Sequence, residues 1–294
     1  MTKFWQNFKL LANPTTNLPE LSDIAGNDGE NEFGANLSKI DGLAVFKNKR
    51  IKDGNAGLHE IDFIIVHYKK IYLVEIKNWS GSVSQNAKKE WIQTNKNKTI
   101  NHANPLLKLL RNTTFFVNFL RKEGFDLSGY EIFPQVVFMS KSLKFAKNFK
   151  DEYYIKKSGE FLQQISTKKR YFKFKKPRKN DPKLIELLSS LTVWSRLYLY
   201  GGAVLTGSIR YFEINGKKTR LPKHFRANLS LKWSRNKPIS FLNSLFGKRK
   251  KIQIKSKIFK IKPTDSVGFL QAGNRGIKLV KFGLIEKIIK DDIE

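Results

Sequence analysis

Two short apolar segments, residues 61–66 and 71–77, are the feature that most constrains the fold of this chain. Both are rich in Ile, Val, Phe and Tyr, and only the four polar residues 67–70 separate them, so the sequence predicts two β-strands joined by a short turn. Their apolar residues occupy both faces, which is typical of strands buried on both sides of a sheet. Each strand nevertheless contains one carboxylate, Asp62 in the first and Glu75 in the second.

The register of this hairpin predicts that the two carboxylates meet. If residues 67–70 form the loop, Asp62 lies directly opposite Glu75, with Cβ atoms about 5 Å apart. Side chains alternate between faces along a strand, so Lys77 projects to the same face as Glu75. Two carboxylates this close both ionise only when a cation lies between them, and an oxygen site of this kind suits Mg²⁺ or Mn²⁺.

A metal site formed by Asp62 and Glu75 would serve hydrolysis, although the pair also has an interpretation without function. A bound divalent ion polarises a phosphoryl oxygen and lowers the pKa of a coordinated water, while the Lys77 ammonium could orient that water or neutralise developing charge. The pattern therefore predicts metal-assisted hydrolysis of a phosphodiester. The alternative is a solvated Asp–Glu pair on the surface of a sheet, but the apolar neighbours make burial, and hence a partner for each acid, the expectation.

Charge is the strongest global property of the chain. Its 294 residues carry 56 Lys and Arg against 25 Asp and Glu, a formal net charge of +31. This excess predicts a polyanionic partner, with nucleic acid first and an anionic membrane surface second. No stretch is apolar over the 18 residues that a membrane helix needs, so we expect no membrane insertion. The absence of cysteine excludes disulfides and fits a cytoplasmic protein.

A third carboxylate, Glu30, lies in a predicted helix. Helical periodicity begins near Asp28, and Phe33, Leu37 and Ile40 mark one apolar face. Glu30 points to the same face, which makes it a candidate third acid of the site. The other interpretation is an acid of the first helical turn that complements the helix dipole.

Further elements alternate with the hairpin and predict an α/β core that ends near residue 165. We expect a strand over residues 43–51, a helix that begins at Pro105 and ends at Gly124, and a strand over residues 135–140. The core stripe of that helix consists of Leu106, Leu109, Leu110, Phe116, Val117 and Leu120.

Four pieces of the sequence occur in an order that is specific to one known domain. They are Gly26-x-x-Gly29-Glu30-x-x-Phe33-x-x-x-Leu37, then Ile61-Asp62, then Glu75-Ile76-Lys77-Asn78-Trp79-Ser80-Gly81, and then Asn104-Pro105. Together they resemble the NERD (nuclease-related) domain, which is assigned to the PD-(D/E)xK nuclease superfamily. The resemblance covers about residues 26–140 and is most specific over the run that begins at Glu75.

This resemblance implies an α/β restriction-endonuclease-like core, a mixed sheet flanked by helices. It implies that Asp62 and Glu75 bind the metal together with the Ile76 carbonyl, that Lys77 is the catalytic lysine, and that Glu30 holds a metal-bound water or a second metal. DNA would be the substrate and Mg²⁺ or Mn²⁺ the cofactor, in DNA processing or in prokaryotic defence against foreign DNA. A helicase or another DNA-processing protein would be a possible partner.

Two positions depart from the family pattern. Ile61 replaces the proline of the superfamily's name, which is common in this branch. Lys108 follows Asn104-Pro105 where the family usually has a glutamine. The lysine has two interpretations, contact with a phosphate of the substrate or a solvated side chain, and the second is slightly favoured.

Beyond residue 165 the chain is strongly basic. We expect a basic linker over residues 166–182, then a domain over residues 183–294 that begins with a helix over 183–200 and continues as a small β-rich sandwich or barrel with a hairpin at Asn215-Gly216. A single strand is expected over 251–262, and residues 287–294 are expected to fray. Aromatic side chains interleave the linker, where bases could stack. The cations expected to contact nucleic acid, besides Lys108, are Lys168, Lys169 and Arg170 in the linker and Lys248, Arg249, Lys250 and Lys251 in a loop tip.

The sequence thus supports three functions from different classes. The first is a metal-dependent nuclease whose amino-terminal domain spans residues 1–165. The second is a nucleic-acid-binding protein with a silent nuclease fold, against which the intact set of acids and lysine argues. The third is a scaffold bound electrostatically to an anionic membrane surface, which would bind liposomes and cut no nucleic acid.

Overall fold

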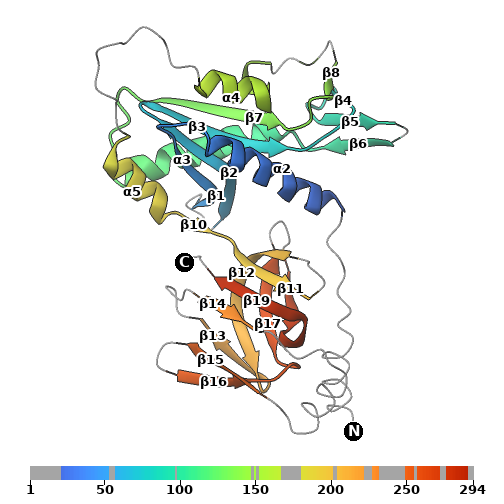
Figure 1. Ribbon diagram of the computed structural model, residues 1–294, viewed down its shortest axis with the longest axis vertical. Coiled ribbons are helices and arrows are strands. Elements are labelled where there is room, and N and C mark those ends of the chain that lie inside the picture. Colours follow the sequence, from blue (N-terminus) through green and yellow to red (C-terminus); the bar gives the residue numbers. More distant parts are fainter. Residues whose placement is uncertain are drawn as a thin grey trace. The chain divides into compact units, whose positions relative to one another are not determined.

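The computed structural model describes residues 21–52, 57–96, 98–146, 149, 152–166, 180–200, 204–221, 227–231, 249–254, 257–271 and 276–290 (Figure 1). Contacts between residues divide the chain into two compact units, one of them Leu21–Leu191 and the other containing Thr192–Glu294. The described part is mixed α/β, with four α-helices and several sheets. Within those residues, no helix combines the length and apolarity required to cross a bilayer.

The predicted hairpin is the centre of the first unit. Strand β2 (Leu58–His67) pairs antiparallel with β3 (Lys70–Lys77), and Val66 faces Ile71 as predicted. The loop is shorter than expected, because His67 also pairs with Lys70 and leaves a two-residue turn in which Tyr68 has a φ of 58°.

Three further strands extend this hairpin into a mixed sheet. The outer antiparallel neighbour of β2 is β1 (Ala44–Lys52), and β7 (Glu131–Phe138) runs parallel to β3. Beyond β7 lies β9 (Ile155–Lys157), also parallel, so the strands follow in the order β1-β2-β3-β7-β9. The sequence predicted β7 from residue 135, but the strand begins four residues earlier.

Helices cover both faces of this sheet, which explains the two-sided apolar pattern of its strands. Helices α2 (Leu21–Leu37) and α4 (Ser158–Ser166) pack on one face, where Phe33 and Phe161 join a core with Phe63 and Ile65 of β2. Helices α3 (Pro105–Lys122) and α5 (Pro182–Ser190) pack on the other face. The apolar residues of β2 that meet them are Ile61, Ile64 and Val66.

Local sequence signals define the ends of α3. The Asn104 side chain accepts hydrogen bonds from the backbone N–H groups of Leu106 and Leu107, and Pro105 occupies the first turn. Gly124, with a φ of 65°, follows the carboxyl end as predicted. Helix α2 begins at Leu21, earlier than the expected start near Asp28.

A second, smaller sheet is an element that the sequence did not predict. It consists of β4 (Ser82–Gln85), β5 (Trp91–Asn95), β6 (Lys98–His102) and the two-residue β8 (Lys144–Phe145), in the order β6-β5-β4-β8. Strands β5 and β6 form a hairpin that extends outward from the end of the main sheet (Figure 1). This segment has few apolar residues and its strands are polar, so the sequence shows no apolar alternation from which the strands could be predicted.

Helix α5 and the region after it differ from expectation. The helix ends at Ser190 rather than Tyr200, and residues 192–199 form the strands β10 (Thr192–Val193) and β11 (Ser195–Leu199). Leu184 and Leu188 are buried in the core of the first unit, so the contacts group α5 with that unit and place the division after Leu191 rather than before residue 183.

The second unit is all β in its described residues, apart from the single 3₁₀ turn Phe282–Leu284. Its seven-stranded antiparallel sheet has a core of its own, which includes Phe212, Phe269 and Ile288. The strands of this sheet are β11, β12 (Val204–Ile214), β13 (Lys217–Arg220), β14 (Ala227–Ser230), β17 (Ser266–Gln271), β18 (Ile277–Lys281) and β19 (Ile285–Lys290).

Two predictions for this unit were wrong and one was right. The expected single strand over residues 251–262 is a hairpin of β15 (Lys250–Ile254) and β16 (Lys257–Ile261). Residues 287–290 of the expected frayed end belong to β19, whose Ile288 is fully buried, and residues 291–294 lie outside the described residues. The predicted turn at Asn215-Gly216 is present, with φ angles of 52° and 78°.

Two glycines with positive φ provide a matched test of the small sheet. A Cβ at Gly81 (φ 89°) would collide with the Thr94 carbonyl oxygen and lie 2.9 Å from the Asn95 Cα, whereas one at Gly124 (φ 65°) would meet nothing within 4 Å. We expect Gly124→Ala to lower the free energy of unfolding by about 1 kcal/mol, the cost of the left-handed conformation alone. Gly81→Ala should cost about 3 kcal/mol or more, because backbone must also move. Equal losses in thermal or urea unfolding would contradict this close approach.

Candidate active site

Glu75 lies near the carboxyl end of β3, where two lysines hold its buried carboxylate. Its side chain is almost inaccessible, with 2% of the residue exposed. Lys77, two residues further along the strand, places its Nζ 2.8 Å from Glu75 Oε1, as the predicted shared face requires. Lys108 approaches from α3, with its Nζ 3.0 Å from Oε1 and 3.1 Å from Oε2.

Asp62 lies beside Glu75 because the β2–β3 pairing changes at this point. The backbone pairs end at Phe63 and Val74, and one step further the same register places Asp62 opposite Glu75, as predicted. Here the Ile76 N–H donates to Asp62 Oδ2 at 2.8 Å. A side-chain carboxylate therefore takes the place of a backbone carbonyl, and the partly exposed Asp62 side chain turns toward β3.

Asn48 on β1 is a site residue that the sequence analysis missed. Lys47 pairs with Phe63 and Lys49 with Ile61, so Asn48 lies opposite Asp62, and its φ of 54° interrupts the strand. With its amide oriented to satisfy both neighbours, Asn48 Nδ2 donates to Glu30 Oε2 at 3.2 Å and to the Asp62 carbonyl oxygen at 3.3 Å. Asparagine tolerates this conformation, but no local pattern connects it to Glu30.

Glu30 approaches the site from α2, and Asn48 lies between its carboxylate and the Asp62 backbone. The preceding residue has no side chain, and a Cβ on Gly29 would lie 3.0 Å from the Asn78 Cβ and 3.3 Å from the Met139 Cγ. The glycine thus lets the helix approach the strand ends closely. Glu30 Oε2 lies 3.4 Å from the Nζ of Lys47 on β1.

The electrostatics of the four central groups are uneven. Burial, followed by repulsion from Glu75, raises the pKa of Asp62 well above its ordinary value. Burial also tends to raise the pKa of Glu75, but Lys77 and Lys108 together outweigh it and hold that pKa below its ordinary value. Burial raises the pKa of Glu30 against the opposing effects of Lys47 and Asn48. The carboxylates of Glu75 and Asp62 outweigh burial at Lys77 and raise its pKa.

The donor set fits a hard divalent cation, with one condition. Asp62 and Glu75 supply carboxylate oxygens. Within an extended strand the N–H and C=O of one residue point to the same side, so the Ile76 carbonyl shares the side of its N–H and of Asp62. In the described residues, however, no three His, Cys, Asp or Glu side chains are grouped closely enough to hold an ion. Both oxygens of Glu75 are bound to lysine, so a metal would have to displace Lys108.

The expected nucleic-acid contacts have different outcomes. Lys108 lies in the site and binds Glu75, so the solvated interpretation was wrong even though 44% of its side chain is exposed. Lys250 and Lys251 begin β15 instead of forming a loop tip, and Arg249 directly precedes that strand and is exposed. Four other cations lie outside the described residues: Lys168, Lys169, Arg170 and Lys248.

One comparison with known proteins found a match within the first unit. Residues 25–139 match the family model of the NERD domain, described as a nuclease-related domain. This range contains most of α2 and all of the β2–β3 hairpin, α3 and β7, and with them Glu30, Asp62, Glu75, Lys77 and Lys108. No curated protein and no solved structure matches the chain.

The opposite pKa shifts of Asp62 and Glu75 predict opposite effects of neutral replacements on stability. The folded-state pKa of Asp62 is raised, so its contribution favours folding at low pH and is lost as pH rises through that value. Glu75 has a lowered folded-state pKa, so its contribution is present at neutral pH and is lost as pH falls through that value.

We therefore expect Asp62→Asn, which keeps an acceptor for the Ile76 N–H, to raise the melting temperature of the metal-free protein at pH 7. The gain should be on the order of 1 kcal/mol. Glu75→Gln should lower stability by about 2 kcal/mol, since Lys77 and Lys108 lose their counter-charge. Both differences should shrink in acid. Calorimetry at pH 7 and in acid measures them, and changes of the same sign at pH 7 would contradict the assignment.

Proposed function

We propose that the nuclease-related domain of residues 25–139 is a divalent-metal-dependent nuclease that hydrolyses phosphodiester bonds, with DNA as substrate. The observation that carries this proposal is the convergence of Asp62, Glu75 and Lys77 at the end of one hairpin. The net charge of +31 supports a polyanionic substrate. Backbone phosphates would supply most of the binding energy, so we infer little sequence specificity.

The residues of the site divide the work of hydrolysis between them. Asp62, Glu75 and the Ile76 carbonyl would hold Mg²⁺ or Mn²⁺, and Glu30 would bind a coordinated water or a second ion. When bound, the ion supplies charge that polarises the phosphoryl oxygen and lowers the pKa of a water. Lys77 is held by Glu75 and stays protonated, so its ammonium can orient the attacking water or neutralise charge that develops on the phosphate.

Lys108 has a separate role in this proposal. Without metal, its ammonium bridges both oxygens of Glu75 and keeps the buried acid paired. A metal held by Glu75 would displace Lys108 from the carboxylate. Its side chain is 44% exposed and long enough to turn toward the substrate phosphate. Lys108 would therefore exchange the Glu75 carboxylate for the substrate phosphate. The uncharged glutamine of the family pattern could not take this role.

A second candidate function is a nucleic-acid-binding protein that does not cut. It is favoured by one observation, the occupation of both Glu75 oxygens by lysine in a region where no three metal-binding side chains group among the described residues. If the metal cannot displace Lys108, the same basic surface would bind DNA without hydrolysis. In either case we infer a role in DNA processing or in defence against foreign DNA, with a helicase or similar protein as a possible partner.

A cleavage assay separates the two functions. Wild type should cut circular or linear DNA with Mg²⁺ or Mn²⁺ and not with EDTA. Asp62→Ala should lower the rate at least about 100-fold, because a direct metal ligand is removed. Asp126→Ala is the matched control, since Asp126 lies in the loop after α3 and its exposed carboxylate accepts hydrogen bonds from the backbone N–H and the hydroxyl of Ser128. Retained cutting in Asp62→Ala would refute the site, and binding without cutting under every condition would favour the second function.

The exchange role of Lys108 predicts opposite effects on metal binding and on catalysis. Lys108→Gln removes the cation that competes for Glu75, so Mn²⁺ should bind about 10-fold more tightly in calorimetry without nucleic acid. At saturating Mn²⁺ the cleavage rate should nevertheless fall, since the phosphate loses a positive partner. Lys122→Gln, at the other end of α3, should change neither. Unchanged Mn²⁺ affinity in Lys108→Gln would show that the Lys108 ammonium does not compete with the metal for Glu75.

A further inference from the structure

The residues that follow Lys77 in the most specific piece of sequence have no place in the catalytic set, and the structure ties them to the small sheet. The Trp79 ring stacks on His102 of β6, with ring centroids 4.1 Å apart. Ser80 accepts two hydrogen bonds from β5, one at its carbonyl oxygen from Gln93 Nε2 (3.0 Å) and one at its Oγ from Asn95 Nδ2 (2.7 Å). The chain therefore leaves the catalytic lysine and immediately anchors β5 and β6.

Gly81 lets the backbone that follows Ser80 lie close to β5. Its φ of 89° and its approach to Thr94 and Asn95 leave no room for a side chain. The position of the β5–β6 hairpin relative to Lys77 is thus fixed by three consecutive residues, Trp79, Ser80 and Gly81. A surface held this rigidly beside a catalytic residue can align a substrate.

One face of the hairpin leads from the active site to its tip. Directly opposed residues share a face, and the pairs are Trp91 with His102, Gln93 with Ile100, and Asn95 with Lys98. At the base of this face, His102 Nε2 lies 3.1 Å from Gln93 Oε1. Burial, followed by the nearby Lys77 ammonium, lowers the pKa of His102. His102 stacks on Trp79, two residues after Lys77, so the base of the face lies close to the catalytic lysine.

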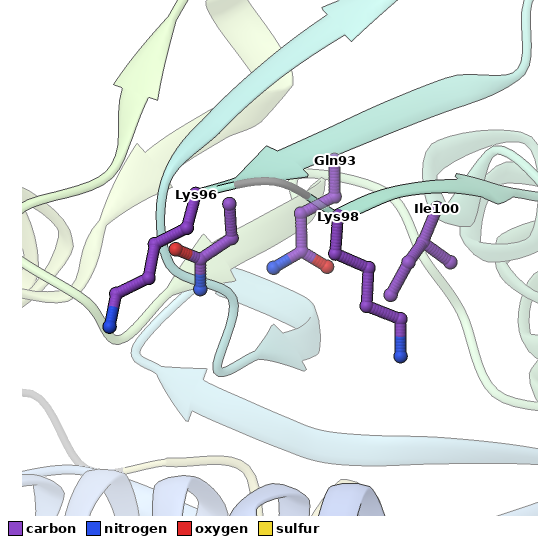
Figure 2. Close-up of a pocket in the computed structure, with 5 residues that line it drawn as sticks. Gln93, Lys96, Lys98 and Ile100 are labelled. Atoms are coloured by element: carbon purple, nitrogen blue, oxygen red, sulfur yellow. The ribbon is translucent and has the colours of Figure 1, made fainter.

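The outer part of the face is an open, positively charged pocket. It has a volume of about 470 Å³ and is lined by amide, ammonium and aliphatic side chains, with no acid among them (Figure 2). In Figure 2 the side chains of Gln93, Lys96 and Lys98 project to the same side of the hairpin, next to Ile100. Both lysines are exposed. The five lining residues are Gln93, Asn95, Lys96, Lys98 and Ile100.

We propose that this face of the β5–β6 hairpin is a substrate-positioning arm that binds the sugar-phosphate backbone of the nucleic-acid strand on one side of the phosphate to be cut. This inference rests on the proposed function and adds to it the surface that aligns the strand. The ammonium groups of Lys96 and Lys98 and the amides of Gln93 and Asn95 donate to phosphate oxygens, and Ile100 contacts the sugar. An open polar groove suits a polymer that continues past it, whereas small-molecule sites are enclosed and mostly apolar.

The length of the face sets the number of nucleotides it covers. His102 lies four residues along the strand from Lys98, a distance of about 13 Å at about 3.3 Å per residue. A duplex strand presents one phosphate per about 3.4 Å of helix axis, so Lys96 and Lys98 would meet phosphates about four nucleotides from the scissile position. Substrates that end sooner on that side cannot use the arm.

Charge reversal at the tip tests the arm, and the opposite turn of the same small sheet provides the control. Lys96→Glu/Lys98→Glu changes two exposed lysines on the proposed face. Lys88→Glu/Lys89→Glu makes the same change of charge at two exposed lysines in the β4–β5 turn, and Lys89 shares the positive φ of Lys96 (62° and 50°). Binding is measured by fluorescence anisotropy in EDTA, with a labelled DNA duplex of about 20 base pairs and a single strand of the same length.

We expect Lys96→Glu/Lys98→Glu to weaken binding of the duplex, the single strand or both at least about 10-fold, and to reduce the salt dependence by about two phosphate contacts. The control should change affinity less than about threefold. In cleavage, the arm variant should raise KM for long DNA with little change in kcat, and should cut substrates with one or two nucleotides beyond the scissile phosphate as well as wild type does.

An equal loss of affinity in both variants would show that net charge alone weakens binding, and would overturn the arm. Unchanged binding of both probes by Lys96→Glu/Lys98→Glu would also overturn it. Matching melting temperatures exclude unfolding as the cause. Because binding is measured without metal, the arm is tested independently of catalysis. If wild type never cuts DNA but the arm variant loses binding, the arm is supported and the proposed nuclease function is refuted. If wild type, arm variant and control cut DNA equally well, the nuclease function is supported and the arm is refuted.

Discussion

The buried Glu75 carboxylate is the group on which the rest of the site depends. A carboxylate that is almost fully removed from water must be paired, and Lys77 and Lys108 supply that pairing from a strand and a helix. This arrangement fixes the end of β3 relative to α3. Burial, followed by repulsion from Glu75, raises the pKa of the neighbouring Asp62. The site therefore stores an electrostatic imbalance that a divalent ion would relieve.

The geometry of the sheet concentrates these groups at one place. Backbone pairing between β2 and β3 stops just before Asp62, whose carboxylate accepts from the Ile76 N–H instead. On the other side of β2, Asn48 adopts a left-handed conformation opposite Asp62 and reaches Glu30. Both strands that flank Asp62 thus give up regular structure around it. Local irregularities of this kind cost stability and are typical of functional sites.

The seven residues from Glu75 to Gly81 both supply groups of the site and hold the small sheet in place. Its first half supplies the acid, the carbonyl and the lysine of the site, while its second half anchors β5 and β6 through stacking, hydrogen bonds and a close backbone approach. Under the proposed function, this one short segment would couple the chemistry of the site to the alignment of the nucleic-acid strand. A change in either half would disturb the other, because no flexible linker lies between Lys77 and Trp79.

Local interactions explain what the sequence by itself determined. The β2–β3 register follows from a short turn and strand alternation, the ends of α3 follow from Asn104, Pro105 and Gly124, and the shared face of Glu75 and Lys77 follows from a two-residue spacing. Glu30 could be placed only with the help of the family resemblance. Tertiary structure alone decided that Lys108 reaches Glu75, that Asn48 bridges two acids, that α5 packs on the first unit and that polar β5 and β6 form a sheet. Lys108, Asn48 and α5 contact residues of other elements, and such contacts leave no periodicity in the chain. Strands β5 and β6 are adjacent in the chain, but their polar residues lack the apolar alternation by which a strand is predicted.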